Sequence, residues 1–277
     1  MLEVRGLRVA LPDRGRKPAF GRAPLLEILK GIDLDLAAGE TLGVVGESGS
    51  GKSTLARTLL RLYDASAGNI KFEGRDITRA DDTAMRELRT RMQIVFQDSQ
   101  SALNPRSRIG TVLAEPFLVH GRAADRAEAL DKAAGLLSRV GLPREFLDRY
   151  PHQLSGGQRQ RVGIARAIAL GPALVVADEI VSGLDVSVQA QVLDLLRALR
   201  AETGMALLLI SHDLSVVRVL CEKILVMQHG RVVEAGRTAE IFDNPQDPYT
   251  RKLLRAIPLP VVDPAWMDSV DVEEETT

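Results

Sequence analysis

This sequence of 277 residues has a single cysteine, no long apolar run and no large excess of either charge. The single cysteine, Cys221, excludes an internal disulfide and a cysteine-held metal cluster, and we expect it to pack in the core as a small hydrophobe. Lys and Arg total 36 and Asp and Glu total 37, so no overall field attracts nucleic acid or acidic lipid. A local basic patch is still compatible with this balance.

The apolar stretches are too short to cross a membrane. The most apolar one, 205–210, falls far below the roughly 20 residues that a spanning helix needs. The first five residues, Met1 to Arg5, are not followed by the apolar segment of a secretory signal. We therefore expect a chain that is soluble by itself and reaches a membrane only through partners. The length of 277 residues allows one large domain or two small ones, and the 45% hydrophobic content can build a sizeable core.

Strand and helix patterns alternate along the chain, and a helical stretch interrupts them. Alternating apolar residues predict β-rich segments over 2–11 and 25–45, followed by a helix from Lys52 to about Tyr63. Residues 98–170 are mostly helical, whereas alternation resumes beyond them. The remaining predictions are strands at 68–72, 92–96, 173–177, 205–210 and 223–227, a helix over 186–201 and a helix from residue 213. The pattern indicates an α/β core divided by a helical insertion.

A glycine-rich turn between a predicted strand and a predicted helix matches the phosphate-binding pattern G-x-x-x-x-G-K-[ST]. Its residues are Gly46, Glu47, Ser48, Gly49, Ser50, Gly51, Lys52 and Ser53. The glycines let the backbone N–H groups point inward, and the helix adds a partial positive charge at its start. We expect Lys52 to reach the β- and γ-phosphates, Ser53 to ligate Mg²⁺ and Thr54 to assist at the α-phosphate. The alternative is a Gly/Ser-rich turn that matches by chance.

Polar side chains follow three further predicted strands. Asp178 ends an apolar strand and can hold Mg²⁺ through its waters, while Glu179 can reach the water that attacks a γ-phosphate. Gln97 can bind the metal or that water, and His212 can orient the transition state as a donor. Each residue by itself also has an ordinary explanation, as a strand end, a helix cap or a surface amide.

A small pentapeptide opens a further predicted helix that carries several arginines. Its residues are Leu154, Ser155, Gly156, Gly157 and Gln158. Small residues at a helix start expose N–H groups to an anion, although one such pentapeptide is modest evidence. It lies between Gln97 and the Asp178–Glu179 pair, and Asp185 and His212 follow in turn. This ordered set resembles the ATP-binding-cassette (ABC) ATPases over most of residues 2–235.

The resemblance implies an α/β fold, namely an ABC-type P-loop NTPase with a RecA-like core, an antiparallel β subdomain and an inserted α-helical subdomain. It implies ATP and Mg²⁺ as cofactors, with Ser53, Gln97 and Asp178 as metal ligands. Glu179 is then the catalytic base, acting with Lys52, His212 and Gln97. The expected domains are an ATPase domain over 1–257, including the insertion 98–170, and a Pro-rich, acidic tail over 258–277.

The same resemblance implies that two cassettes sandwich two ATP molecules head to tail. Ser155 and Gly157 would contact the γ-phosphate held by the second subunit, with Gly156 and Gln158 in the same nucleotide-binding group. Asp185 would lie in the D-loop between the subunits. ATP binding would then close the pair, and hydrolysis would open it.

Two longer stretches are similar to the oligopeptide, dipeptide and nickel importer branch. They are an extended Q-loop over 96–106 and a C-terminal segment over 241–254, whose plainer interpretation is a Pro-capped surface helix. The segment 180–183 departs from the family pattern, although the neighbouring acids are retained. The residue that stacks on adenine stays open between Leu11 and the less well placed Phe20.

The branch implies a second, non-identical ATPase subunit, two transmembrane permease subunits and, indirectly, a solute-binding protein. The chain would sit peripherally on the cytoplasmic face of the membrane. An exporter ATPase and a nickel or other small-solute importer are the alternatives, and a cassette acting on DNA or ribosomes is a third. We expect no nucleic-acid partner, because neither a long coiled coil nor a basic arm is visible in the sequence.

Overall fold

A six-stranded sheet forms the centre of the protein, which a computed structural model describes for residues 1–13, 23–96 and 103–256. The strand order is β10-β9-β3-β8-β7-β6, and all neighbours are parallel except β10 against β9. The strands are β3 (Thr41–Val45), β6 (Met92–Val95), β7 (Leu174–Asp178), β8 (Ala206–Ile210), β9 (Lys223–Gln228) and β10 (Arg231–Arg237). The predicted α/β core is therefore confirmed, with crossovers placing β8 between β3 and β7.

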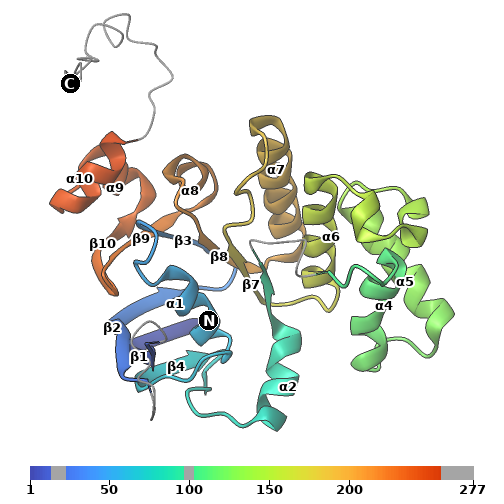
Figure 1. Ribbon diagram of the computed structural model, residues 1–277, viewed down its shortest axis with the longest axis horizontal. Helices are drawn as coiled ribbons and strands as arrows, with labels where there is room; N and C mark the ends of the chain where they lie inside the picture. The colour runs from blue at the N-terminus through green and yellow to red at the C-terminus, as the bar shows by residue number, and fades with distance from the viewer. Residues whose placement is uncertain (14–22, 97–102, 257–277) are drawn as a thin grey trace, which may run out of the picture.

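A second, antiparallel sheet packs against this core in the order β2-β1-β4-β5. Its strands are β1 (Leu2–Pro12), β2 (Leu25–Leu36), β4 (Ala67–Phe72) and β5 (Arg75–Asp76). Helices α1 (Lys52–Leu59) and α2 (Asp82–Arg91) connect the two sheets in the chain. Figure 1 shows this blue sheet at one end of the molecule, with α1 beside it.

The core strands of the central sheet divide their apolar side chains between two hydrophobic clusters. Val175 and Ala177 of β7 join the cluster that contains the helices between β6 and β7, whereas Leu174 and Val176 join the cluster shared with the antiparallel sheet, α1 and α2. Successive strand residues point to opposite faces, so a continuous apolar run serves both. This explains why β7 is buried at every position, whereas much of β1 alternates between buried and exposed residues.

The described part of the segment between β6 and β7 is mostly helical, as predicted. It contains α4 (Ile109–Val119), α5 (Arg126–Arg139), two short 3-10 helices (Arg144–Asp148 and Pro151–Gln153) and α6 (Gly156–Ile168). Ala133, Leu137 and Val140 are buried and Leu130 is partly buried against the same cluster, so they form one apolar face of the helical segment. These helices gather at the end of the molecule opposite the antiparallel sheet (Figure 1).

The remaining helices follow β7 and the last strands. They are α7 (Val186–Thr203), α8 (Leu214–Leu220), α9 (Thr238–Asp243) and α10 (Pro248–Arg255). Pro248 stands in the first turn of α10, as the Pro-capped interpretation required. No helix in the described ranges is both long and apolar enough to span a membrane.

Three expectations need correction or lie outside the structure. The first helix ends at Leu59, earlier than the predicted Tyr63, because residues 60–63 form a turn in which Arg61 has a positive φ of 56°. The sequence reading missed α2 and β10. The predicted roles of Gln97 and Phe20, and the predicted tail 258–277, fall outside the described residues.

Cys221 offers a direct test of the core. The thiol is buried, and this burial raises its pKa to about 12, so almost no reactive thiolate exists near neutral pH. We expect the native chain at pH 7.5 to resist a thiol-specific disulfide reagent and to react with one equivalent after unfolding in guanidinium. Rapid labelling of the native chain would contradict this packing.

Candidate nucleotide-binding site

The ends of three adjacent strands bring the predicted site residues together. In the order β3-β8-β7, the glycine-rich loop follows β3, His212 follows β8, and Asp178 and Glu179 end and follow β7. Carboxyl ends of parallel strands meet at one edge of a sheet, which is where ligands bind in open α/β folds. The strand β6 pairs with β7 in parallel beside it. Gln97, which comes after β6 in the sequence, lies outside the described residues.

The loop backbone is shaped by glycines that other residues could not replace. Gly46 has φ 150°, and a Cβ there would lie 2.1 Å from the carbonyl oxygen of Met227. Gly51 has φ 104° and is the N-cap residue of α1. Because glycine has no side chain, no side-chain hydrogen bond caps the first N–H groups of this helix. Such a helix start presents donors and a partial positive charge to a phosphate.

Lys52 lies folded into this loop. Its Nζ donates hydrogen bonds to the carbonyl oxygens of Gly46 at 2.7 Å and of Glu47 at 2.9 Å. Burial lowers the pKa of Lys52, while the charges of Glu179 and Asp178 act in the opposite direction. The ammonium group is therefore held in place and partly stripped of water, which strengthens its attraction for a phosphate.

Asp178 and Ser53 form the oxygen pair expected for a metal. The Ser53 hydroxyl donates to Asp178 Oδ1 at 3.1 Å. Burial raises the pKa of Asp178, although the Ser53 hydrogen bond and the charge of Arg57 lower it. Among the described residues, no three acidic, histidine or cysteine side chains converge on one point. The pair suits Mg²⁺, which usually takes one or two protein oxygens and completes its shell with phosphate and water.

Glu179 and His212 face each other across the strand ends. His212 Nδ1 lies 3.4 Å from Glu179 Oε2, and the glutamate side chain is only 17% exposed against 57% for the histidine. Glu179 adopts the left-handed backbone conformation with φ 49°, and its N–H donates to the carbonyl of Ile210. A non-glycine residue in that conformation is strained, and such strain gathers at functional sites.

A cavity of about 400 Å³ opens over the loop. Its walls contain most of the predicted phosphate-binding residues together with Glu179 and one apolar residue, Ile28 of β2. The lining residues are Ile28, Ser48, Gly49, Gly51, Lys52, Ser53, Thr54 and Glu179. Leu11, the adenine candidate, packs instead against the core cluster of the antiparallel sheet. The sequence analysis did not predict Ile28 as a cavity residue, and no pattern in the sequence distinguishes it from other apolar strand residues.

The pentapeptide stands apart from this cavity and forms the start of α6. The Ser155 hydroxyl accepts a hydrogen bond from the N–H of Gln158, whose side chain accepts one from the N–H of Ser155. Gly157 lies against α7, since a Cβ there would come within 2.4 Å of Val188 Cγ1. Gly156 opens the helix, and none of these residues lines the cavity over the loop. Figure 1 places α6 well away from α1.

Asp185 serves as the N-cap of α7. Its carboxylate accepts hydrogen bonds from the N–H of Val188 at 2.9 Å and the hydroxyl of Ser187 at 2.6 Å. The Ser187 bond, followed by the Val188 bond, lowers the pKa of Asp185. The helix-cap interpretation therefore accounts for Asp185 within one chain, and the residue lies outside the cavity over the loop.

Comparison with known proteins decides the family. The profile described as "ABC transporter" matches residues 29–182, more than half of the chain. The chain belongs to the ABC transporter family. This cassette is an ATPase of the oligopeptide/dipeptide branch, because the profile described as "Oligopeptide/dipeptide transporter, C-terminal region" matches residues 233–274.

Relatives of this cassette are similar over most of their length. A Brucella ovis protein described as a peptide import ATP-binding protein is 46% identical over 260 residues, 94% of this chain and 79% of the relative. The oligopeptide transport ATP-binding protein OppF of Salmonella typhimurium is 43% identical, covering 94% of this chain and 78% of OppF. A solved dimeric ATP-binding cassette in a post-hydrolysis state, bound to ADP and phosphate, has a TM-score of 0.74 and 28% identity. It covers 86% of this chain and 99% of that one.

One further residue at the site was missed by the sequence reading. Tyr249, in the first turn of α10, accepts a hydrogen bond from the N–H of Glu47 at 2.9 Å. The tyrosine is buried in the core cluster, against which Leu253 and Leu254 of α10 also pack. The C-terminal segment of the cassette therefore contacts the phosphate loop directly.

Proposed function

We propose that this chain is the ATP-hydrolysing subunit of an importer of peptides or peptide-like solutes. The observation that carries the proposal is the meeting of the phosphate loop, Asp178, Glu179 and His212 at one sheet edge. The names of its relatives support the solute class. We assign residues 1–257 to the ATPase domain, with the insertion 98–170 as its helical part.

In this proposal Lys52 and the loop N–H groups hold the β- and γ-phosphates. Ser53 and Asp178 hold Mg²⁺, which screens the phosphate charge, with Gln97 as a further ligand by resemblance. Glu179 accepts a proton from the water that attacks the γ-phosphorus, and its low exposure keeps bulk water from competing. His212 orients the Glu179 side chain and donates a hydrogen bond to the transferred phosphoryl group.

The separation of the pentapeptide from its own phosphate loop supports a head-to-tail pair of cassettes. Beyond the Ser155–Gln158 capping box, the small residues at the start of α6 leave room for an anion from outside the chain. Ser155, Gly156, Gly157 and Gln158 would then bind the ATP held by a second ATPase subunit, a non-identical relative. This chain would sit peripherally on the cytoplasmic face of the membrane, bound to two permease subunits and connected through them to an external solute-binding protein.

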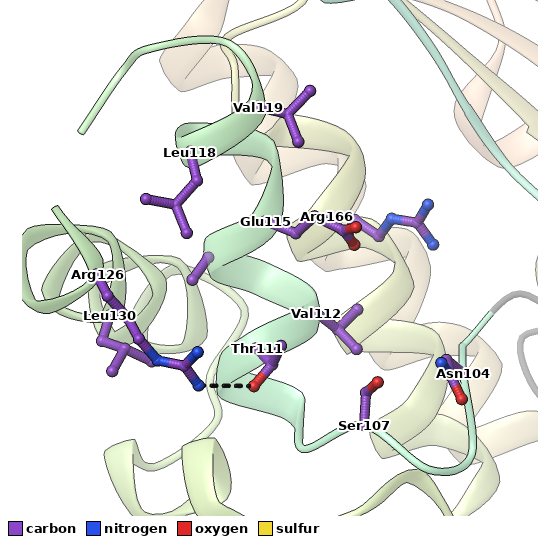
Figure 2. Close-up of a pocket in the computed structure, with 11 residues that line it drawn as sticks. Asn104, Ser107, Thr111, Val112, Glu115, Leu118, Val119, Arg126, Leu130 and Arg166 are labelled. Atoms are coloured by element: carbon purple, nitrogen blue, oxygen red, sulfur yellow. Dashed lines mark hydrogen bonds between the residues drawn. The ribbon is translucent and has the colours of Figure 1, made fainter. Parts of the chain in front are cut away.

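A groove in the helical insertion fits the permease contact. It has a volume of about 450 Å³ and lies along α4, between α5 and α6. Figure 2 shows Leu118 and Val119 at one end and Asn104 and Ser107 at the other. The groove is lined by apolar residues and by charged residues such as Glu115 and Arg126. This mixture matches the apolar and polar faces of a short amphipathic helix from a membrane partner.

A charge in this groove should uncouple the cassette from its permease. Leu118 is 42% exposed at the groove wall, so Leu118→Glu should leave folding and ATP binding intact while weakening permease association about tenfold or more. Co-purification of the assembly from detergent measures this loss. Leu62→Glu is the matched control, because Leu62 is 48% exposed and lies outside the groove. Equal recovery of both variants would contradict the placement.

The function itself is tested on the whole assembly. The chain, co-purified with its permease subunits and placed in lipid vesicles, should hydrolyse ATP faster when a peptide-loaded binding protein is present. Peptide should accumulate only with ATP, and an assembly carrying Glu179→Gln should accumulate none. ATP-driven movement of peptide in the opposite direction would instead favour an exporter, and absence of ATP binding would refute the proposal.

A further inference from the structure

The C-terminal helix α10 contacts the phosphate loop across 202 residues of sequence. The Tyr249 hydroxyl oxygen accepts the Glu47 N–H, and the tyrosine is only 8% exposed, so packing holds the ring in place. Lys252 lies one turn further along and is 3.4 Å from Glu47 Oε1, but its side chain is 76% exposed. The tyrosine bond is therefore the ordered contact, and the lysine pair is a solvent-screened one.

The peptide group that Tyr249 holds also holds Lys52. The N–H of Glu47 and the carbonyl of Gly46 belong to one planar unit, and that carbonyl accepts the hydrogen bond from Lys52 Nζ at 2.7 Å. Rotation of this unit would move both ends together. The backbone of Gly46 lies close to β9, because a Cβ at this position would come within 2.1 Å of the carbonyl oxygen of Met227.

Contacts outside the loop also hold α10 in place. Asp247 caps the helix by accepting hydrogen bonds from the N–H groups of Tyr249 and Thr250 at 2.8 and 3.4 Å. Glu234 of β10 accepts from the N–H groups of Gln246 and Asp247 at 2.7 and 3.1 Å. The central sheet thus anchors the turn before α10, and the turn places the tyrosine.

We propose that Tyr249 is a positioning residue for the nucleotide. It fixes the Gly46–Glu47 peptide, and through that peptide it orients Lys52 toward the β- and γ-phosphates. Docking of α10 on the loop then sets the affinity for ATP, and bound ATP in turn stabilises the docking, because such coupling is reciprocal. This inference rests on the phosphate-binding role proposed above for Lys52.

Tyr249→Phe tests the proposal, since phenylalanine keeps the ring and removes only the hydroxyl. We expect MgATP to bind the full-length chain about fivefold to tenfold more weakly in a calorimetric titration, the effect of one lost hydrogen bond. Amide exchange at Glu47 should accelerate in the nucleotide-free variant. The melting temperature without nucleotide should stay within about 2 °C of the native chain, because the ring packing is retained.

Lys252→Ala is the matched control on the same helix. It removes the exposed ion pair and leaves the peptide contact, so its MgATP affinity should stay within about twofold of native. If Tyr249→Phe bound MgATP as tightly as the native chain, or lost its fold, the hydroxyl would have a structural role alone and the proposal would fall. A native chain that bound no MgATP would refute the proposed function as well, which separates the two failures.

Discussion

Replacing Lys52 with alanine is expected to remove ATP-induced stabilisation of the chain and to lower ATP turnover by about a hundredfold or more. The ammonium group is buried in the loop, where its attraction for phosphate is little weakened by water. Burial lowers the pKa of Lys52, which means that the charged ammonium form is less stable in the folded chain than in water. The substitution removes that cost while leaving the carbonyls of Gly46 and Glu47 without their donor.

These opposing effects predict that the nucleotide-free variant melts close to the native chain. Thermal melting with and without millimolar MgATP measures both quantities in one experiment, because a ligand stabilises only the state that binds it. Lys71→Ala is the control, since Lys71 is exposed on β4 away from the cavity. A full MgATP-induced shift in Lys52→Ala would contradict the assignment of the loop.

Replacing Glu179 with glutamine is expected to block hydrolysis while preserving ATP binding. Glutamine has nearly the same volume and can keep the contact with His212, but it cannot accept a proton at neutral pH. Loss of a general base lowers turnover by about a hundredfold to ten-thousandfold. With hydrolysis blocked, the ATP-bound pair of cassettes should persist, and gel filtration with MgATP should show a larger species.

The control for this second variant is Glu202→Gln, which neutralises a surface carboxylate paired with Arg139 and outside the site. It should retain native turnover, since exposed ion pairs contribute little. Undiminished hydrolysis by an assembly carrying Glu179→Gln would refute the base assignment. A variant that lost MgATP affinity instead would make Glu179 a binding residue.

Motifs that are continuous in the chain were the most predictable part of the site. Gly46 to Ser53 form their cradle from neighbouring residues, so glycine spacing and the strand and helix on either side suffice to predict it. Asp178 and His212 were predictable for a related reason, because each follows a buried parallel strand. Strand ends of one sheet share an edge, so the chain pattern already placed these residues near each other.

Contacts between distant segments were not predictable in this way. Nothing in the sequence around Ile28 distinguishes it from other apolar residues of β2, yet it lines the cavity. The 241–254 segment was interpreted as a branch signature or a surface helix, and its contact with the loop through Tyr249 did not follow from either interpretation. The strained φ of Glu179 is likewise imposed by the strands around it.

The sequence by itself therefore determined the family, the order of the chemical groups and the α/β core divided by helices. Those properties depend on local spacing and on the periodicity of apolar residues, which a single chain displays directly. Only the tertiary structure decided that α10 contacts the phosphate loop through Tyr249 and that Ile28 lines the cavity over that loop. Such contacts form when burial of apolar side chains in two separate hydrophobic clusters brings remote segments together. The hydrophobic effect is non-directional, so the sequence does not show which remote segments will meet.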